Sequence, residues 1–587
     1  MFIRRLLTGN GWLLLFFAVG CFLFFELNYR YWYRFMEQYS LFLLTGDYFI
    51  GLLRQPGGVT EYITSFVTQF FCFPFFAAVF LALFLSGIGG LFGLFLRRCG
   101  IQVPVVVAVL PVFLFWLYPV ESVASVLAVF FGVLSAVVYS YCGRWAPRCV
   151  VGVLIVLVVY LVAAPAHLLA AVLIGVYEFC VGRSGRRFGV VAGMLTWAVV
   201  LPVIAMRTIY VIPVREAFFS KHLYHPEYPL PASFWYIWCS FPLMALAAYA
   251  LRKRGRLFKK EGVDFVVLLL LLLIVMGGFI VYKRHPLEQA YRYDWYARQQ
   301  QWDRIVRHAG EHPARDKDAL VYVNLAYGHE GRLNEALMRY PQVGEEGFIP
   351  HDPKTRLGLI EASEVSWLVN HINAAQRFAF VGVLSSERCV QPRLMKRLVE
   401  ACLVNEEYEA AGKYIKILEK TLFYRSWAKE QRAFFNPEKA AGADWIVEKR
   451  RYSPVTDNAH DVTIALPSAL AFLIDDHPDN RRAFEYGMGY LLIYKDLGAF
   501  MYYMNQMKER GERFPVLYQE AICIFYAAME KNPEAFASFG IDPEVYQRFQ
   551  GYLSQHRTLS PALLAKQYGD TYYYYAQFVQ PPKRPNR

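Results

Sequence analysis

The residues best suited to chemistry lie in two stretches that interrupt long apolar runs, residues 28–63 and residues 207–232. The first holds two carboxylates, Glu37 and Asp47, set among Tyr, Trp and Arg side chains. A carboxylate placed in this way can act as a general base. The second stretch holds cations and imidazoles: Arg207, Arg215, Lys221, His222 and His225. Because arginine binds phosphate through two parallel hydrogen bonds, these residues are suited to a lipid-linked diphosphate.

Both stretches also have a structural interpretation. The aromatic residues of the first recur at the spacing of a helix lying in the membrane interface, where Tyr and Trp are favoured and long charged side chains reach outward. Pro56-Gly57-Gly58 then predicts a turn back into the membrane. The second stretch can equally be a solvated loop. Glu178, inside an apolar run, is interpreted as half of an interfacial ion pair because Arg183 follows it closely.

Familiar catalytic and cofactor motifs are missing from the sequence. It contains no nucleophile elbow, P-loop, GxGxxG fingerprint or HExxH helix in a supporting context. The ten cysteines form no CxxC pair and no Cys/His cluster with metal-ligand spacing. We therefore expect no metal and no cofactor, and we interpret the cysteines as small buried apolar residues.

The elements that must position these residues are transmembrane helices. The chain has 587 residues and is 56% hydrophobic, which is too apolar for an ordinary soluble protein. A bilayer core needs about 20 mostly apolar residues in a helix. About nine stretches qualify: 8–27, 64–96, 103–119, 122–141, 149–163, 167–182, 188–206, 233–251 and 264–282. The short stretches within 149–182 form either two spans or one re-entrant hairpin.

The distribution of charge predicts the orientation of these helices and argues against nucleic acid as a partner. Residues 1–282 contain 21 Lys/Arg and 10 Asp/Glu, whereas residues 283–587 contain 40 and 38. The excess of cations lies in the loops of the apolar half rather than on one face of a soluble domain. With the N-terminus in the cytoplasm, 15 of the 21 cations fall in short cytoplasmic loops. The prediction is a bacterial inner-membrane protein whose residues 283–587 are periplasmic.

Beyond residue 282 the pattern changes to amphipathic helices with short breaks and a recurring signature. Small residues follow the break in three units, at Ala336, Ala375 and Ala411, which are 39 and 36 residues apart. A weaker copy surrounds residues 497–500. This spacing resembles degenerate tetratricopeptide repeats, whose helix pairs stack into an α-solenoid because one pair cannot bury its apolar face alone.

The predicted fold class is therefore all-α, in three parts. Residues 1–282 form a polytopic transmembrane helix bundle, and residues 283–570 form a periplasmic tetratricopeptide-like helical-repeat domain. Residues 571–587 begin with four consecutive tyrosines after Thr571 and end in a proline-rich run. We expect a last helix and a tail there, or else a segment resting at the membrane interface, where Tyr is favoured.

Two resemblances add to these patterns. In topology the membrane half resembles glycosyltransferases of the GT-C superfamily, which implies sugar transfer from a polyprenyl-phosphate carrier. The resemblance assigns Glu37 or Asp47 as the outer-loop carboxylate. If the protein is a transferase, we expect Arg207, Arg215, Lys221 and His222 to bind the phosphate. The adjacent acidic pair usual in that family is absent. Over nearly the whole chain, the sequence also looks like a bacterial membrane-protein family of unknown function, most clearly in residues 55–58, 62–71 and 421–428.

The leading hypothesis is a membrane-anchored periplasmic scaffold that recruits a protein partner through its repeats to an envelope-assembly process. It follows from the helical repeats and from the missing catalytic motifs. The alternative is a polyprenyl-phosphate-dependent glycosyltransferase acting at the periplasmic face. A transporter is a third option, disfavoured because polar residues are scarce within the apolar stretches.

Overall fold

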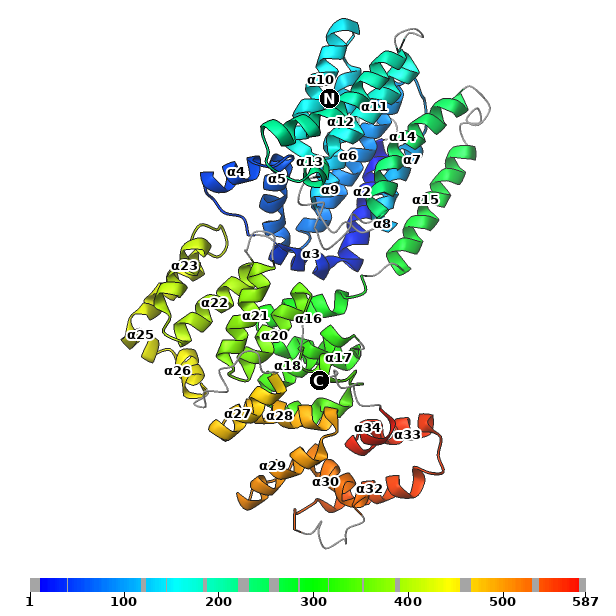
Figure 1. Cartoon of the computed structure of the whole chain (residues 1–587). Coiled ribbons are helices and arrows are strands. Elements are labelled where there is room, and N and C mark those ends of the chain that lie inside the picture. The colour runs from blue at the N-terminus through cyan, green and yellow to red at the C-terminus, as the bar shows by residue number, and fades with distance from the viewer. Residues whose placement is uncertain are drawn as a thin grey trace. The chain divides into compact units, whose positions relative to one another are not determined.

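The computed structural model of the chain describes residues 11–39, 41–117, 123–143, 145–182, 187–219, 232–252, 263–282, 285–314, 316–350, 353–385, 391–453, 466–529 and 538–579. These residues are mostly helical, and none of them forms a strand. The chain divides into two compact units, unit 1 (Met1–His285) and unit 2 (Pro286–Arg587) (Figure 1). The division lies three residues beyond the boundary that we expected at 282.

Unit 1 is a bundle of apolar helices. Within its described part, five helices are long and apolar enough to cross a membrane: α2 (Gly11–Asn28), α6 (Phe76–Arg98), α9 (Val123–Ser140), α12 (Arg187–Thr208) and most of α14 (Ala232–Arg252). The other elements are α3 (Arg30–Met36), η1 (Glu37–Tyr39), α4 (Gly46–Leu53), α5 (Gly58–Thr68), η2 (Gln69–Cys72), α7 (Val105–Val109), η3 (Leu110–Phe113), α8 (Leu114–Leu117), α10 (Trp145–Ala163), α11 (Ala166–Val181), α13 (Val214–Phe219) and α15 (Val263–Tyr282). The chain thus carries the apolar helices of a membrane protein.

The long helices of unit 1 pack in series. α2 packs against α6, α6 against α9, α9 against α11, and α11 against α12. Aromatic rings fill the space beside α2, where Phe24 stacks on Trp116 with ring centroids 4.4 Å apart. Asn28 at the end of α2 donates a hydrogen bond to the Ile280 carbonyl at 3.1 Å, which connects α2 to α15. Such side chain–backbone bonds satisfy polar groups that an apolar bundle would otherwise bury without a partner.

The stretch expected as one long span, residues 64–96, is broken into separate helices. α5 and η2 end at Cys72, and α6 begins only at Phe76. Pro74 lies in the break: proline lacks an N–H donor and disfavours helical geometry in the residue before it, and Phe73 is indeed extended with ψ of 144°. Apolar composition alone does not reveal this break, because the residues directly before and after Pro74 are both phenylalanine.

The turn that precedes α5 packs against the turn between α10 and α11. Gly57 has φ of +74°, and a Cβ at this position would lie 2.8 Å from the Ala164 carbonyl oxygen, so only glycine fits. Its N–H donates to the Leu161 carbonyl at 3.2 Å, and the Thr60 hydroxyl donates to the Val162 carbonyl at 2.8 Å. These donors satisfy carbonyls that the end of α10 leaves without partners inside the helix.

The first part of the loop, α3, differs from the in-plane aromatic segment that we expected. The α3 residues Tyr31, Trp32, Tyr33 and Phe35 are buried, and Tyr33 meets Phe71 edge-on at 5.9 Å. α3 therefore packs into unit 1 instead of presenting its rings to lipid. The apolar side chains of the loop that remain exposed lie mainly on and around α4.

Unit 2 consists of shorter helices, which are α16 (Glu288–Arg298), α17 (Trp302–Glu311), α18 (Lys317–Glu330), α19 (Leu333–Ala336), η4 (Leu337–Arg339), η5 (Glu345–Gly347), α20 (Arg356–Leu368), α21 (Ile372–Leu384), α22 (Pro392–Val404), α23 (Tyr408–Leu418), α24 (Arg425–Gln431), η6 (Arg432–Phe435), α25 (Pro437–Ala441), α26 (Asp444–Arg451), α27 (Leu466–Asp476), α28 (Arg481–Tyr494), α29 (Leu497–Glu509), α30 (Val516–Ala528), α32 (Pro543–Gln555), α33 (Pro561–Tyr568) and α34 (Tyr572–Phe578). Consecutive helices pair in hairpins, such as α20 with α21 and α22 with α23. Ala336, Ala375 and Ala411, the small residues of the sequence signature, are all buried at these pairings.

Five of these hairpins are closed by the same turn. A residue in the left-handed conformation lies two positions before the second helix in each: Gln300, Gly331, Asn370, Glu406 and Lys495. The N–H of the residue that follows then donates to a carbonyl five positions back, at 2.8–2.9 Å in every case. This is the Schellman arrangement, which satisfies carbonyls at the end of the first helix. The shared turn makes α16–α17 a fifth member of the series, which the sequence signature does not include.

The last helix, α34, is built into unit 2. Tyr572, Tyr573 and Tyr575 are buried, so the alternative in which these tyrosines rest at a membrane interface is wrong. Glu520 on α30 accepts a hydrogen bond from the Tyr572 N–H at 2.8 Å, and Lys495 donates to the Ala576 carbonyl at 2.6 Å. A carboxyl group thus meets the N-terminus of α34 and an ammonium group its C-terminus, where N–H and C=O groups lack partners inside the helix. The boundary expected at 570 falls inside this packed region.

Candidate functional site

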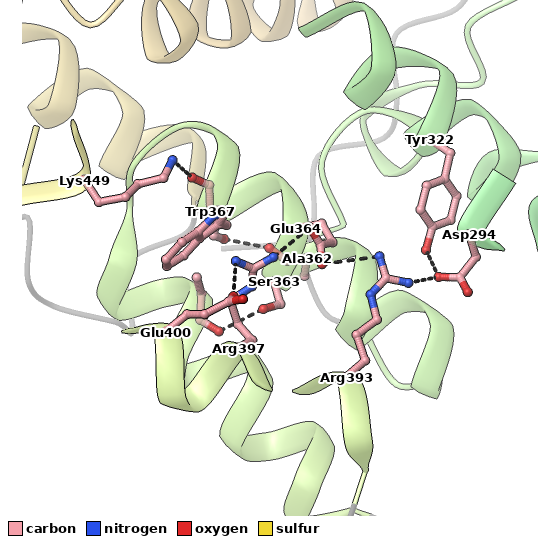
Figure 2. A network of polar contacts seen from close by, with 12 residues as sticks. Asp294, Tyr322, Ala362, Ser363, Glu364, Trp367, Arg393, Arg397, Glu400 and Lys449 are labelled. Atoms are coloured by element: carbon pink, nitrogen blue, oxygen red, sulfur yellow. Dashed lines mark hydrogen bonds and ion pairs between the residues drawn. The ribbon is translucent and has the colours of Figure 1, made fainter. Parts of the chain in front are cut away.

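A network of buried charges joins four helices of unit 2 (Figure 2). Arg393 and Arg397 lie one turn apart on α22, so both reach toward α20. Nη2 of Arg397 is 2.8 Å from Oε2 of Glu364, and Nη2 of Arg393 is 3.3 Å from Oε1 of the same carboxylate. Arg393 also pairs with Asp294 on α16, whose Oδ1 accepts a hydrogen bond from the Tyr322 hydroxyl at 2.7 Å. Glu364 therefore pairs with both Arg393 and Arg397, and Arg393 pairs with both Glu364 and Asp294.

Trp367 extends the network from α20 to α26. The guanidinium carbon of Arg397 lies 4.2 Å from the centroid of the Trp367 ring, a cation–π contact. Lys449 on α26 donates to the Trp367 carbonyl at 2.6 Å and to Oδ1 of Asn370 at 2.5 Å. The neighbouring Arg450 donates to the Val404 carbonyl at 3.0 Å. α26 thus brings one cation to the C-terminal end of α20 and another to that of α22, where carbonyls lack helical partners and the dipole is negative.

The electrostatics of the network follow from burial and from these pairings. Burial by itself raises the pKa of Glu364, but Arg397 and Arg393 outweigh it and hold the pKa at about 2. Burial lowers the pKa of Lys449 to about 7. The Glu361 carboxyl, one turn before Glu364, is buried with Asp318 and Asp294 nearby, and its pKa is raised well above the usual value, mainly by desolvation.

The contacts of this network fit a structural role. Glu364, Arg393 and Arg397 satisfy one another at hydrogen-bonding distance while almost fully removed from water. A paired and desolvated charge is costly to separate. The network therefore holds α16, α20, α22 and α26 in a fixed relation, and it stiffens the helices that present their outer faces to solvent.

The outer face of α21 carries an exposed apolar stripe. Phe380, Val381 and Leu384 are exposed, and with Arg377 they occupy positions i, i+3, i+4 and i+7 of one helix face. The opposite face is small and buried, and at Gly382 a Cβ would lie 2.1 Å from Cδ1 of Leu394 on α22. The second half of α21 is thus apolar on its exposed side as well as on its buried side, a pattern that indicates a contact surface.

Of the carboxylates singled out in the sequence, Glu37 is buried and Asp47 is exposed. Glu37 lies in η1, and its carboxylate accepts a hydrogen bond from the side-chain amide of Gln38. Asp47 lies in the first turn of α4. η1 packs against η2, whereas α4 packs against α5, so the two carboxylates belong to different packing groups.

The predicted phosphate-binding residues lie on other elements of unit 1. Arg207 is exposed at the end of α12, and Arg215 is exposed on α13, which packs against α12. Lys221 and His222 lie outside the described residues. The principal packing partners of α12 are α11, α10 and α13, while α3 and η1 pack on η2 and α6.

The buried polar groups of unit 1 include several that sequence reasoning did not single out. Glu178 forms an ion pair, as expected, but its partner is Arg148, whose Nε lies 2.9 Å from Oε1; Arg183 lies outside the described residues. The Tyr139 hydroxyl donates to the same oxygen at 2.9 Å. Glu61 on α5 is also buried. For Glu61 the sequence offers a signal, since Thr60, Glu61, Ser65 and Thr68 form a polar stripe at helical spacing.

The exposed stripe of α21 was also missed, although its signal is present in the sequence. Residues 372–384 contain one charge, Arg377, and residues 380–384 are all apolar or glycine. From sequence alone, a short apolar helix of this kind is predicted to be buried, because the number of neighbouring helices that pack on it is not known. In the structure, α21 packs on α20 and α22, and Phe380, Val381 and Leu384 remain exposed on its other side.

Comparison with known proteins gives a match to one sequence family. No curated protein and no solved structure matches the chain. A sequence profile described as "Family of unknown function (DUF6057)" matches residues 4–579. The chain belongs to this family. The match runs through both units, so the apolar bundle and the helical unit together make up the DUF6057 sequence.

Proposed function

We propose that this DUF6057 protein is a membrane-anchored scaffold whose helical unit binds a protein partner. The observation that carries the proposal is the exposed apolar stripe of α21, formed by Arg377, Phe380, Val381 and Leu384 on the outside of a charge-stiffened stack of helices. An exposed apolar surface of this kind is typical of a protein-binding site. A rigid stack with such a face loses little conformational entropy on binding.

The membrane arrangement that goes with this role has nine spans. Besides the five long helices, the proposal counts four further apolar segments as spans: the α7–η3–α8 run, α10, α11 and α15. An odd number of spans with a cytoplasmic N-terminus places unit 2, with its tetratricopeptide-like repeats, in the periplasm. A reporter that works only in the periplasm, such as alkaline phosphatase, is expected to be active when fused after residue 579. Activity of a cytoplasmic reporter at the same point would contradict this orientation.

The partner is tested on the full-length chain in its own membrane. Phe380→Ser with Leu384→Ser removes the apolar stripe at exposed positions, so the variant is expected to accumulate normally. Quantitative mass spectrometry of purified complexes should then lose the stoichiometric partner. The matched control is Leu553→Ser with Leu563→Ser, two exposed leucines of unit 2 on α32 and α33, which should retain it. Recovery of the same proteins from all three chains would overturn the proposal.

The second candidate function is polyprenyl-phosphate-dependent glycosyl transfer, favoured by one observation. The segment from α2 to α5 buries three carboxylates, Glu26 on α2, Glu37 on η1 and Glu61 on α5. Buried carboxylates in a unit that carries membrane helices are functional candidates by default. Glu37 or Asp47 would act as base, with Arg207 and Arg215 (and Lys221 and His222) holding phosphate. Membranes that carry Glu37→Ala with Asp47→Ala should then fail to use a labelled polyprenyl-phosphate sugar. Unchanged use would end this candidate.

A further inference from the structure

α4 stands apart from the other elements of unit 1. It projects from the side of the bundle and runs across the direction of the long helices (Figure 1). Thr45 caps its N-terminus by accepting a hydrogen bond from the Tyr48 N–H at 3.3 Å. The helix is thus a defined element that packs on α5 through one side only.

The residues of α4 fall into three sectors when they are placed at 100° per residue. Tyr48 and Leu52 form the sector that packs inward, and Leu52 is buried. Phe49, Ile50 and Leu53 form a second sector and are 37%, 53% and 40% exposed. The third sector is polar: Asp47 and Arg54, seven positions apart, share one exposed line. A helix with one docked side, one bare apolar side and one charged side fits the boundary between lipid and water.

The bare apolar sector is continuous with the surface of a candidate span. Phe49 contacts Tyr62 on α5 at 4.9 Å between ring centroids. Further ring contacts of 5.0–5.5 Å lead through the buried Phe42 to Phe66 on α5, which is 41% exposed, and then through Phe70 to Phe76, the first residue of α6. The outer side of α6 continues the surface with Val79 and with Leu83, which is 65% exposed. Exposed apolar side chains thus lie on α4, on α5 and on α6, three helices that these ring contacts join.

We propose that α4 is an interfacial helix whose Phe49–Ile50–Leu53 sector lies among the acyl chains of the bilayer. Its polar sector, with Asp47 and Arg54, then lies among the lipid headgroups. The occupant is lipid rather than a second protein, because the apolar sector adjoins the bare side of a span while the charged sector lies beside it. A single planar boundary satisfies both sectors at once.

The test places a photo-crosslinking residue on each sector of α4 in the full-length chain. Benzoylphenylalanine replaces Phe49 on the apolar sector, Asp47 on the polar sector, or Leu83 on α6 as a positive control. Each variant is reconstituted in nanodiscs of phosphatidylethanolamine and phosphatidylglycerol and irradiated. Intact-protein mass spectrometry then reports the mass added.

Positions 49 and 83 are expected to gain the mass of one lipid, with a yield at 49 at least several-fold above that at 47. A crosslinked dimer or another protein at position 49 would overturn the proposal, as would a lipid adduct at 83 with none at 49. If the substitution at 49 prevents folding, Ile50 offers a second position in the same sector. Equal lipid yield at 47 and 50 would likewise contradict an interfacial orientation.

Discussion

Glu364 and Arg397 form an ion pair inside unit 2, with an Nη2–Oε2 distance of 2.8 Å between α20 and α22. The two arginines beside it hold the pKa of Glu364 at about 2, against 4.5 in the unfolded chain. A carboxyl with a depressed pKa stabilises the folded state above its unfolded pKa, and this contribution is lost as the pH falls through the folded value. The pair is therefore expected to lose about 3 kcal/mol of stability between pH 4.5 and pH 2.

The variant Glu364→Gln should lack this part of the acid dependence while being less stable at neutral pH by about 3 kcal/mol, because two buried guanidinium groups lose their anion. Thermal unfolding of the full-length chain in detergent, followed by circular dichroism from pH 7 to pH 2, measures both effects. Glu409→Gln serves as control, since its pair with Lys413 is exposed and should change stability by less than about 0.5 kcal/mol. Parallel acid curves for wild type and Glu364→Gln would contradict the assignment.

The close approach of α21 to α22 predicts that Gly382→Ala is destabilising. The new Cβ would lie 2.1 Å from Cδ1 of Leu394, so α21 must move or Leu394 must leave its position. Overpacking of this kind costs about 1–3 kcal/mol. Gly310→Ala on α17 is the matched control, because nothing lies within 4 Å of its Cβ. There alanine should stabilise the helix by about 0.5–1 kcal/mol. Equal melting temperatures for the two variants would argue against tight packing at Gly382.

The shared hairpin turn predicts that Gln300→Gly is stabilising. Gln300 has φ of +54°, a conformation that costs a residue with a Cβ about 1–2 kcal/mol and glycine much less. Part of the gain is offset by the greater freedom of glycine in the unfolded chain, so we expect about 0.5–1 kcal/mol, or a melting temperature higher by about 1–3 °C. Gln299→Gly, one residue earlier at φ of −90°, should lower it instead.

The cap of α34 predicts a stability loss toward alkaline pH. Burial raises the pKa of Glu520 to about 7, from 4.5 in the unfolded chain. A raised carboxyl pKa gives stability that is fully present below pH 4.5 and is lost as the pH rises through 7. Hydrogen exchange of residues 572–578 should therefore quicken between pH 5 and pH 8, after correction for the intrinsic rate.

The control for this effect keeps the hydrogen bond and removes the charge. In Glu520→Gln the side-chain amide oxygen can still accept from the Tyr572 N–H, so α34 should stay docked with no pH dependence of its own. Glu544→Gln, at an exposed position on α32, should behave as wild type. A pH response that survives in Glu520→Gln would place its origin elsewhere.

The apolar stretches show what sequence composition can predict in this chain. The stretch 122–141 became α9, and the stretch 188–206 became α12, because a long uncharged run has few ways to satisfy its backbone other than a helix. The same reasoning was wrong for 64–96, where the chain breaks at Pro74 and α6 begins only at Phe76. Composition reports how apolar a stretch is and gives little information on where its backbone turns.

The hairpin turns show a different limit. The helix pair around Ala375 could be predicted because a small residue is needed where two helices pack closely. No such sequence feature accompanies Gln300. Left-handed residues at these turns are glutamine, glycine, asparagine, glutamate and lysine, so residue type does not identify them. The conformation is imposed by packing of the two helices, and it became visible only with backbone angles.

The charge network was beyond reach from the sequence for a simpler reason. Arg393 and Asp294 are 99 residues apart, and Lys449 and Trp367 are 82 apart. Periodicity and local motifs compare residues within one or two turns of a helix, and no local spacing connects these partners. The predicted site residues were chosen by the same local reasoning, which groups residues by loop instead of by the element each loop packs against.

The clamp on α34 has a consequence for the order in which the protein is made. The hydrogen bond of Glu520 forms only after Tyr572, 52 residues later, has been synthesised. The hydrogen bond of Lys495 requires Ala576, 81 residues later. Domains fold as the chain emerges from the ribosome, N-terminal parts first, so this contact closes only once synthesis has all but ended. A chain that stops short of residue 572 leaves a carboxylate, an ammonium group and an apolar trough uncovered together. The C-terminal helices of unit 2 therefore cannot complete their packing until the last residues of α34 are present.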